Sequence, residues 1–191
     1  MNRIFLFAII AISLICTNCK TISKTGDGAN NQAIKVEEAN KSYVEENGML
    51  VGKIEREQLE DGEYNEWFKP RYEAYEVSDI DAKSLTNLMS GVDVTIVMGT
   101  WCPDSRREVP NFYKIMDNLN LSSTIELIAV DRSKITPQGF TSGLKIQRVP
   151  TFIFTKDNTE LGRIVEYPIE SLEKDMIKIL SGEDYSHAYE R

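Results

Sequence analysis

Five consecutive residues, Trp101-Cys102-Pro103-Asp104-Ser105, constrain the fold of this chain more than any other segment. They follow the β-rich apolar run 92–99, which is continuous enough for a buried strand. They precede apolar residues at helical spacing as far as about residue 119, which predicts a helix kinked at Pro110. A cysteine at such a junction lies among the unpaired N–H groups and the positive dipole end of the helix. Both favour the thiolate, which is the nucleophile in disulfide exchange.

The first 19 residues differ in composition from the rest of the chain. An apolar run over 4–15 follows a short basic start, and it is shorter than the about 20 residues that a membrane-spanning helix needs. It fits the core of a secretory signal peptide. The run ends in Cys16-Thr17-Asn18-Cys19, which resembles a bacterial lipoprotein signal. That resemblance implies a lipid on Cys19, with Cys16 as the alternative, and an exported protein anchored in the bacterial cell envelope on the periplasmic or outer-membrane side. An ordinary signal peptide or an uncleaved anchor is the other interpretation.

The chain has three cysteines. If the signal is removed and Cys19 carries lipid, Cys102 is the single free thiol and no intramolecular disulfide can form. An unpaired cysteine in an exported protein is either reactive or buried and inert. The expected position of Cys102 at a helix N-terminus favours a reactive thiol.

The composition also argues against several function classes. The formal net charge is −8 and there is no long basic run, so we expect no nucleic-acid partner. The one histidine, His187, lies near the C-terminus. One histidine and one free thiol are too few for an ordinary transition-metal site, so we expect no metal and no cofactor.

The rest of the chain divides by composition into four segments. Residues 20–46 are polar and predict a flexible tether. Residues 47–75 are too aromatic for a linker and predict an extension that packs on the domain, or a flap near the site. Residues 76–182 predict the domain itself, and 183–191 a loose polar tail.

The expected elements alternate between helices and strands. They are a helix capped by Asp79 or Asp81 that runs to 88, a strand over 92–99, a helix over 103–119, a strand over 124–130, a short helix or irregular connection over 136–144, strands over 151–155 and 160–166, and a helix over 169–180. This order predicts a mixed β-sheet with helices on both faces.

Four features in register resemble the thioredoxin superfamily: the Trp101-Cys102-Pro103 turn, Pro110, the run Arg148-Val149-Pro150-Thr151-Phe152, and the hairpin and helix after it. The resemblance spans 76–181 and implies a three-layer α/β thioredoxin-like fold. It also implies that Pro150 is the family's cis-proline, and that the Val149 backbone lies beside Cys102 and pairs with an extended substrate peptide.

Two positions depart from the family pattern. Ser105 stands where the second, resolving cysteine is usual, and a hydroxyl cannot displace a disulfide partner. Ile96 stands where the family often buries an acid that aids proton transfer. The chain alone therefore does not supply the usual two-cysteine cycle.

The charged residues after the cysteine have opposing effects. Asp104 suits the helix dipole but repels a thiolate, and Arg106 and Arg107 can offset that repulsion or meet an acidic partner. We expect Glu108 to be solvated.

Two functions are compatible with these features. One is a monothiol thiol–disulfide oxidoreductase that forms mixed disulfides through Cys102 with proteins or low-molecular-weight thiols. The alternative is a non-catalytic thioredoxin-fold module that binds proteins or peptides.

Overall fold

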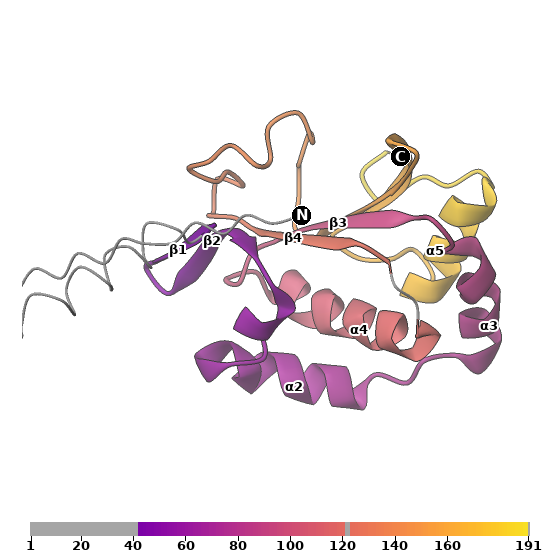
Figure 1. Ribbon diagram of the computed structural model, residues 1–191, viewed down its shortest axis with the longest axis horizontal. Helices are drawn as coiled ribbons and strands as arrows, with labels where there is room; N and C mark the ends of the chain where they lie inside the picture. The colour runs from indigo at the N-terminus through magenta and orange to yellow at the C-terminus, as the bar shows by residue number, and fades with distance from the viewer. Residues whose placement is uncertain (1–41, 121–122, 191) are drawn as a thin grey trace, which may run out of the picture. The chain divides into compact units, whose positions relative to one another are not determined.

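The computed structural model describes residues 42–120 and 123–190 (Figure 1). The expected signal peptide, Cys16, Cys19 and most of the tether lie outside these residues. The elements are β1 (Tyr43–Glu46), β2 (Met49–Ile54), the short 3-10 helices η1 (Arg56–Gln58) and η2 (Gly62–Tyr64), α2 (Asn65–Ala74), α3 (Asp79–Leu88), β3 (Asp93–Met98), α4 (Pro103–Leu119), β4 (Ile125–Ala129), β5 (Thr151–Lys156), β6 (Thr159–Val165) and α5 (Leu172–Ser181). Within the described ranges no helix combines the length and apolarity needed to cross a membrane.

The strands form one six-stranded mixed sheet in the order β1-β2-β4-β3-β5-β6. β3 and β4 run parallel, and every other neighbouring pair is antiparallel. Val97 near the end of β3 pairs with Thr151 at the start of β5. The antiparallel register therefore brings the turn after β3 next to Pro150, although the two lie far apart in the sequence.

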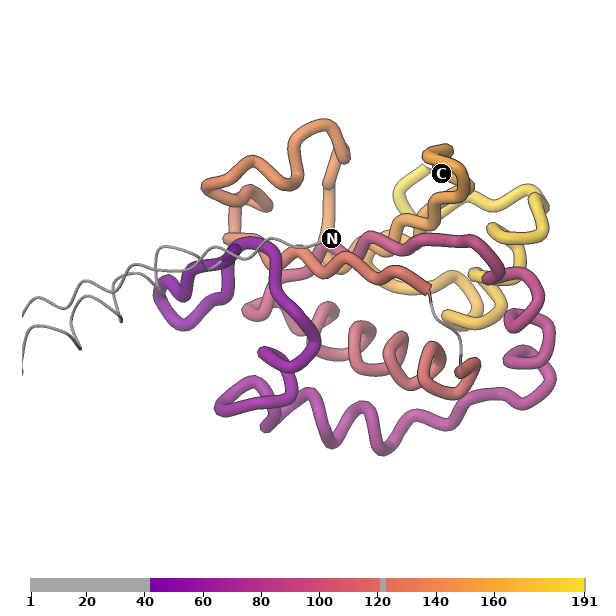
Figure 2. The backbone as a smooth tube through the Cα atoms, viewed as in Figure 1, coloured from indigo at the N-terminus to yellow at the C-terminus, as the bar shows by residue number. Residues whose placement is uncertain are grey.

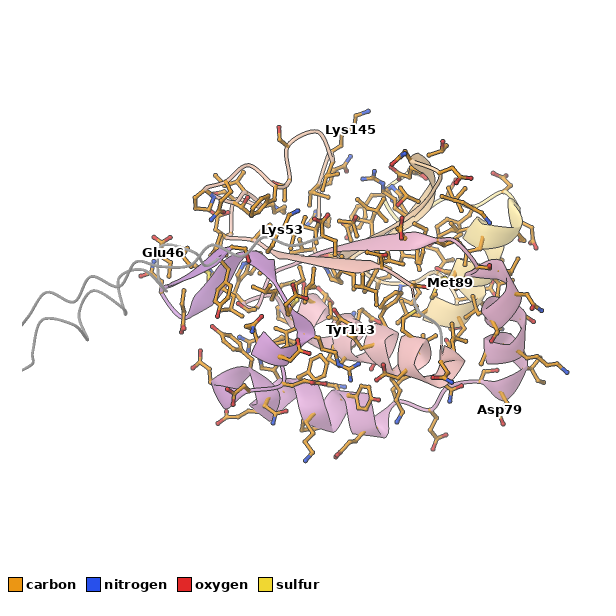
Figure 3. The ribbon with its side chains drawn as sticks, viewed as in Figure 1. Glu46, Lys53, Asp79, Met89, Tyr113 and Lys145 are labelled. Carbon is orange, nitrogen blue, oxygen red and sulfur yellow. The ribbon has the colours of Figure 1, made fainter. Side chains whose placement is uncertain are left out.

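The four α-helices of the described residues pack on one face of the sheet, and Figure 1 shows α2, α3 and α4 on the same side. Their buried side chains join alternate strand residues in a single core. Phe112 of α4 stacks on Phe152 of β5 with ring centroids 4.9 Å apart. Tyr113, labelled in Figure 3, meets Phe68 of α2 at 6.1 Å. Ile96 lies in this core and is fully buried.

The opposite face of the sheet is covered by the segment 131–150, which forms turns and no helix. Phe140, Leu144 and Ile146 of this segment pack on a second apolar cluster. Its buried members are Val97, Cys102, Ile128, Val130 and Val149. Figure 2 shows the segment arching over the sheet on the side away from α2 and α4, and Lys145 lies on it in Figure 3. The thioredoxin-like mixed sheet with helices is confirmed, but an irregular segment replaces the helical cover that we expected on the second face. Gly139 and Gly143 adopt left-handed backbone conformations, which interrupt a helix.

Residues 47–75 are part of the domain and do more than pack on it. β2 joins the sheet beside β4, and α2 packs along α4. Arg56 of η1 and Tyr72 of α2 both bond Asp117 of α4, at 2.8 and 2.7 Å. The domain therefore begins well before residue 76, the boundary that composition suggested.

The C-terminal residues are packed, and are not the loose tail that we expected. The Tyr185 hydroxyl donates to the carboxylate of Asp175 at 2.8 Å, and Asp175 is fully buried. His187 is only 7% exposed. A buried carboxylate must be supplied with donors, and Tyr185 is one of them. This need holds the segment after α5 against the domain.

Candidate functional site

Cys102 is the N-cap residue of α4, and Pro103 occupies the first helical turn. Its thiol donates a hydrogen bond to the carbonyl oxygen of Val149 at 3.2 Å. The peptide bond between Val149 and Pro150 is cis. The thiol therefore lies between a helix N-terminus and the backbone that precedes the cis-proline. The side chain is largely covered, since 6% of the residue is exposed.

Ser105 lies one helical turn after Cys102 and is fully buried. Its hydroxyl accepts a hydrogen bond from the Gly99 amide at 3.2 Å. This bond ties the start of α4 to the end of β3. Ser105 therefore has a structural partner of its own, and it supplies no sulfur that could resolve a mixed disulfide.

Trp101 covers the turn from the side of the second cluster. Its indole N–H donates to the Val130 carbonyl at 2.9 Å. A Cβ atom at Gly99 would lie 2.6 Å from the indole ring, a distance that real Cβ contacts do not show. Gly99 is therefore required for the ring to lie flat on the turn. Sequence reasoning did not single it out, although a glycine between a β-rich run and a turn is a signal of close packing.

The charged residues of α4 are arranged in a chain of ion pairs. Arg107 bonds Asp104 at 2.8 Å and Glu108 at 2.6 Å. Arg106 and Arg107 were both expected to offset the charge of Asp104, and Arg107 is the one that pairs with it. The prediction of a solvated Glu108 is wrong, because the residue is only 6% exposed. Burial raises the pKa of Glu108 above its ordinary value, and the Arg107 guanidinium opposes that rise.

Arg106 has a different role from Arg107. Its Nε donates to the Thr100 carbonyl at 2.6 Å and so supports the turn from outside. The Thr100 hydroxyl in turn accepts from the Leu50 amide of β2 at 3.2 Å. The 47–75 segment therefore contacts the turn between β3 and α4 directly, although no described contact makes it a flap over Cys102.

A cavity of about 240 Å³ is lined among others by Gln147, Thr151 and His187. Neither Cys102 nor Val149 nor Pro150 lines it, so this cavity is separate from the thiol. Among the described residues no three His, Cys, Asp or Glu side chains are grouped to hold a metal ion.

A family model for thioredoxin matches residues 54–179. The chain belongs to the thioredoxin family. The match runs from the last residue of β2 into α5 and contains both the Cys102 turn and Pro150. A crystal structure described as a protein of unknown function from Pseudomonas aeruginosa is 16% identical, with a TM-score of 0.46; 60% of this chain and 80% of that one are covered. No curated protein matches the chain.

The site of this thioredoxin-family domain contains the free thiol of Cys102, and no second free cysteine lies among the described residues. The Cys102 thiol and the Val149 carbonyl oxygen face each other across their hydrogen bond of 3.2 Å. The arrangement is suited to the first half of a disulfide exchange.

Proposed function

We propose that this protein is a monothiol thiol–disulfide oxidoreductase that acts through Cys102. The observation that carries the proposal is the position of the Cys102 sulfur, at the N-cap of α4 and 3.2 Å from the Val149 carbonyl. The helix N-terminus stabilises a thiolate, and the cis-proline segment offers backbone to an extended substrate.

The reaction has two exchange steps. The Cys102 thiolate attacks one sulfur of a substrate disulfide, the bond between the two substrate sulfurs breaks, and the departing sulfur takes the electron pair and a proton. A thiol from outside the chain then attacks the mixed disulfide and releases Cys102. That external thiol supplies the electrons, because Ser105 cannot. Isomerisation and removal of glutathione from proteins need only these steps.

The test is the reactivity of Cys102. Its alkylation rate is compared with that of an unstructured cysteine peptide, and turnover is measured with a glutathionylated peptide and an external thiol. We expect Cys102 to be alkylated faster than the peptide cysteine, and turnover to vanish in Cys102→Ser. Alkylation no faster than that of the peptide, with no turnover, contradicts the proposal.

A peptide-binding module without catalysis is the second candidate. Its supporting observation is the burial of Cys102, which is 6% exposed and occupied by a hydrogen bond to Val149. Capture of partners by native protein and by Cys102→Ala separates the two functions. An unchanged set of partners favours binding, and loss of the disulfide-linked partners favours exchange.

We further propose that the protein is held at the bacterial cell envelope by a lipid on Cys19. The sequence of residues 1–19 supports this location. Metabolic labelling with a radioactive fatty acid in a bacterial host tests it. Label that persists in Cys16→Ala and disappears in Cys19→Ala supports Cys19, and the reverse pattern assigns Cys16. Absence of label from the native protein overturns the anchor.

A further inference from the structure

Three arginines near Cys102 form no ion pair with another described residue, and each lies over an aromatic ring instead. We call them the arginine collar. They are Arg106, 5.7 Å from the Trp67 ring; Arg132, 4.9 Å from the Trp101 ring; and Arg148, 5.1 Å from the Tyr189 ring. All three are exposed.

Each member of the collar either contacts the turn before α4 or directly precedes a residue of the site. Arg106 bonds the Thr100 carbonyl at 2.6 Å, and its amide donates to the Cys102 carbonyl at 3.0 Å. Arg132 lies on Trp101, the residue before Cys102. Arg148 directly precedes Val149, whose carbonyl accepts the hydrogen bond of the thiol. The three guanidinium groups come from α4 and from both ends of the segment 131–150.

Three other arginines of the domain differ from the collar. Arg56, Arg107 and Arg163 are paired with carboxylates, which offset their charge. An aromatic face fixes a guanidinium through a cation–π contact but leaves its net charge and several N–H groups unused. The collar therefore keeps its positive charge in a chain whose formal net charge is −8.

Two acids close to the collar in sequence have partners of their own. Asp104 pairs with Arg107 at 2.8 Å. Asp131 accepts from the backbone amides of Ser133 and Ile135 at 2.9 and 3.0 Å. Neither acid forms an ion pair with a collar arginine, so the three guanidinium groups keep their own positive charge.

We propose that the arginine collar selects disulfides whose target sulfur is flanked by carboxylates. This inference rests on the proposed function and names its substrate class. Carboxylates reach the site from an acidic peptide segment or from a carboxylate-bearing small thiol such as glutathione. The three guanidinium groups bind either of them in the same way, as bidentate donors. The arginines act as specificity residues, while Cys102 performs the exchange.

The experiment uses peptides that differ only in charge. Each carries one cysteine capped as a 2-thiopyridyl disulfide, flanked by Glu, Gln or Lys. Cys102 attacks the peptide sulfur, the bond to the pyridyl sulfur breaks, and the released thiopyridone is read by absorbance. Because the leaving group is the same throughout, the rates report charge alone. We expect the Glu peptide to react roughly tenfold or more faster than the Lys peptide at low salt. The ratio falls towards one at 1 M salt, where the Debye length is about 3 Å.

Variants of the collar test whether its arginines cause the ratio of the Glu-peptide rate to the Lys-peptide rate. Arg106→Gln, Arg132→Gln and Arg148→Gln combined should bring the ratio close to one, and the same three positions changed to Lys should keep most of it. Arg71→Gln is the matched control, because Arg71 is an exposed arginine of α2 that forms no ion pair among the described residues. It should leave the ratio unchanged. Loss of the ratio in both triple variants contradicts a role for charge.

The source of the carboxylates is distinguished by a second pair of substrates. The Gln peptide is capped with glutathione or with cysteamine, and faster exchange of the glutathione form, dependent on the collar, indicates a small-thiol substrate. Selection of the Glu peptide alone indicates an acidic protein segment. Equal rates for the Glu, Gln and Lys peptides overturn the collar and leave the reactive thiol standing. No reaction with any peptide contradicts the proposed function itself.

Discussion

At the scale of single residues, Ser105 decides which half of the exchange the chain can perform. It follows Cys102 by three residues at the start of α4, so the two side chains are neighbours on the helix. Its hydroxyl is buried against the Gly99 amide. Exchange of this one oxygen for sulfur changes the chemistry without requiring a change of fold.

Ser105→Cys should therefore convert the site into a dithiol. We expect the introduced thiol to form a disulfide with Cys102 in mild oxidant, because the three-residue spacing in a helical turn lies within the Cα separation that a disulfide spans. Mass spectrometry of the peptide that contains both positions, without reduction, should show the loss of two hydrogens. Ser105→Ala serves as the control and should show no loss. A variant that keeps both thiols free under oxidant would refute this interpretation of the turn.

Glu108 makes stability depend on pH. Burial raises its pKa in the folded state above the unfolded value of about 4.3, so the folded state binds the proton more tightly. The stability gained in this way is complete below about pH 4 and is lost as pH rises through the folded-state pKa. Urea unfolding between about pH 4 and 7 should show that loss in the native protein and not in Glu108→Gln. The exposed Glu66→Gln should follow the native curve, and a native curve parallel to that of Glu108→Gln would contradict the prediction.

At the scale of elements, most of the domain could be predicted because its signals are local. The helix over 103–119 follows from apolar spacing, and the β5–β6 hairpin from Asp157-Asn158, both of which adopt left-handed conformations. Ser78 caps α3 in place of the expected Asp79 or Asp81, a shift within the ordinary uncertainty of helix ends.

The β1–β2 hairpin was missed although the sequence contains its signal. Asn47-Gly48, a pair typical of tight hairpin turns, joins the two strands, and both residues have left-handed backbones. The polar composition of 20–46 predicted a tether and concealed β1. The pairing of β2 with β4 joins strands that are far apart in the sequence, so it cannot be predicted from a local sequence pattern.

The contact between α2 and α4 gives a prediction at this scale. Asp117 accepts two bonds from Arg56 at 2.8 Å and one from Tyr72 at 2.7 Å. Asp117→Ala should lower the free energy of unfolding by about 1–2 kcal/mol, since a bidentate pair with a further donor exceeds an ordinary surface pair. Glu73→Ala removes the exposed Lys69–Glu73 contact of 3.9 Å and should change it by less than about 0.5 kcal/mol. Equal effects in urea unfolding would show that the network adds nothing.

At the scale of the whole molecule, segments distant in sequence meet around the thiol. β2 bonds the turn through Thr100, α2 supplies Trp67, and the C-terminal segment supplies Tyr189. The thiol and the cis-proline could be placed from sequence because each lies in a recognisable run. The arginine collar could not, since it exists only where these segments converge.

The C-terminal segment has two separable roles in this convergence. Tyr185 donates to the buried Asp175, whereas Tyr189 lies under the Arg148 guanidinium. Tyr185→Phe leaves a buried carboxylate short of a donor and should cost about 1–3 kcal/mol of unfolding free energy, with the charge preference of Cys102 intact. Tyr189→Ala frees Arg148 and should weaken the preference for the Glu peptide severalfold at little cost in stability, because Tyr189 is 36% exposed. Urea unfolding and the peptide rates, measured on both variants, check the two roles. If each variant lowers stability and preference together, the segment acts as one unit and Tyr189 has no separate effect on the site.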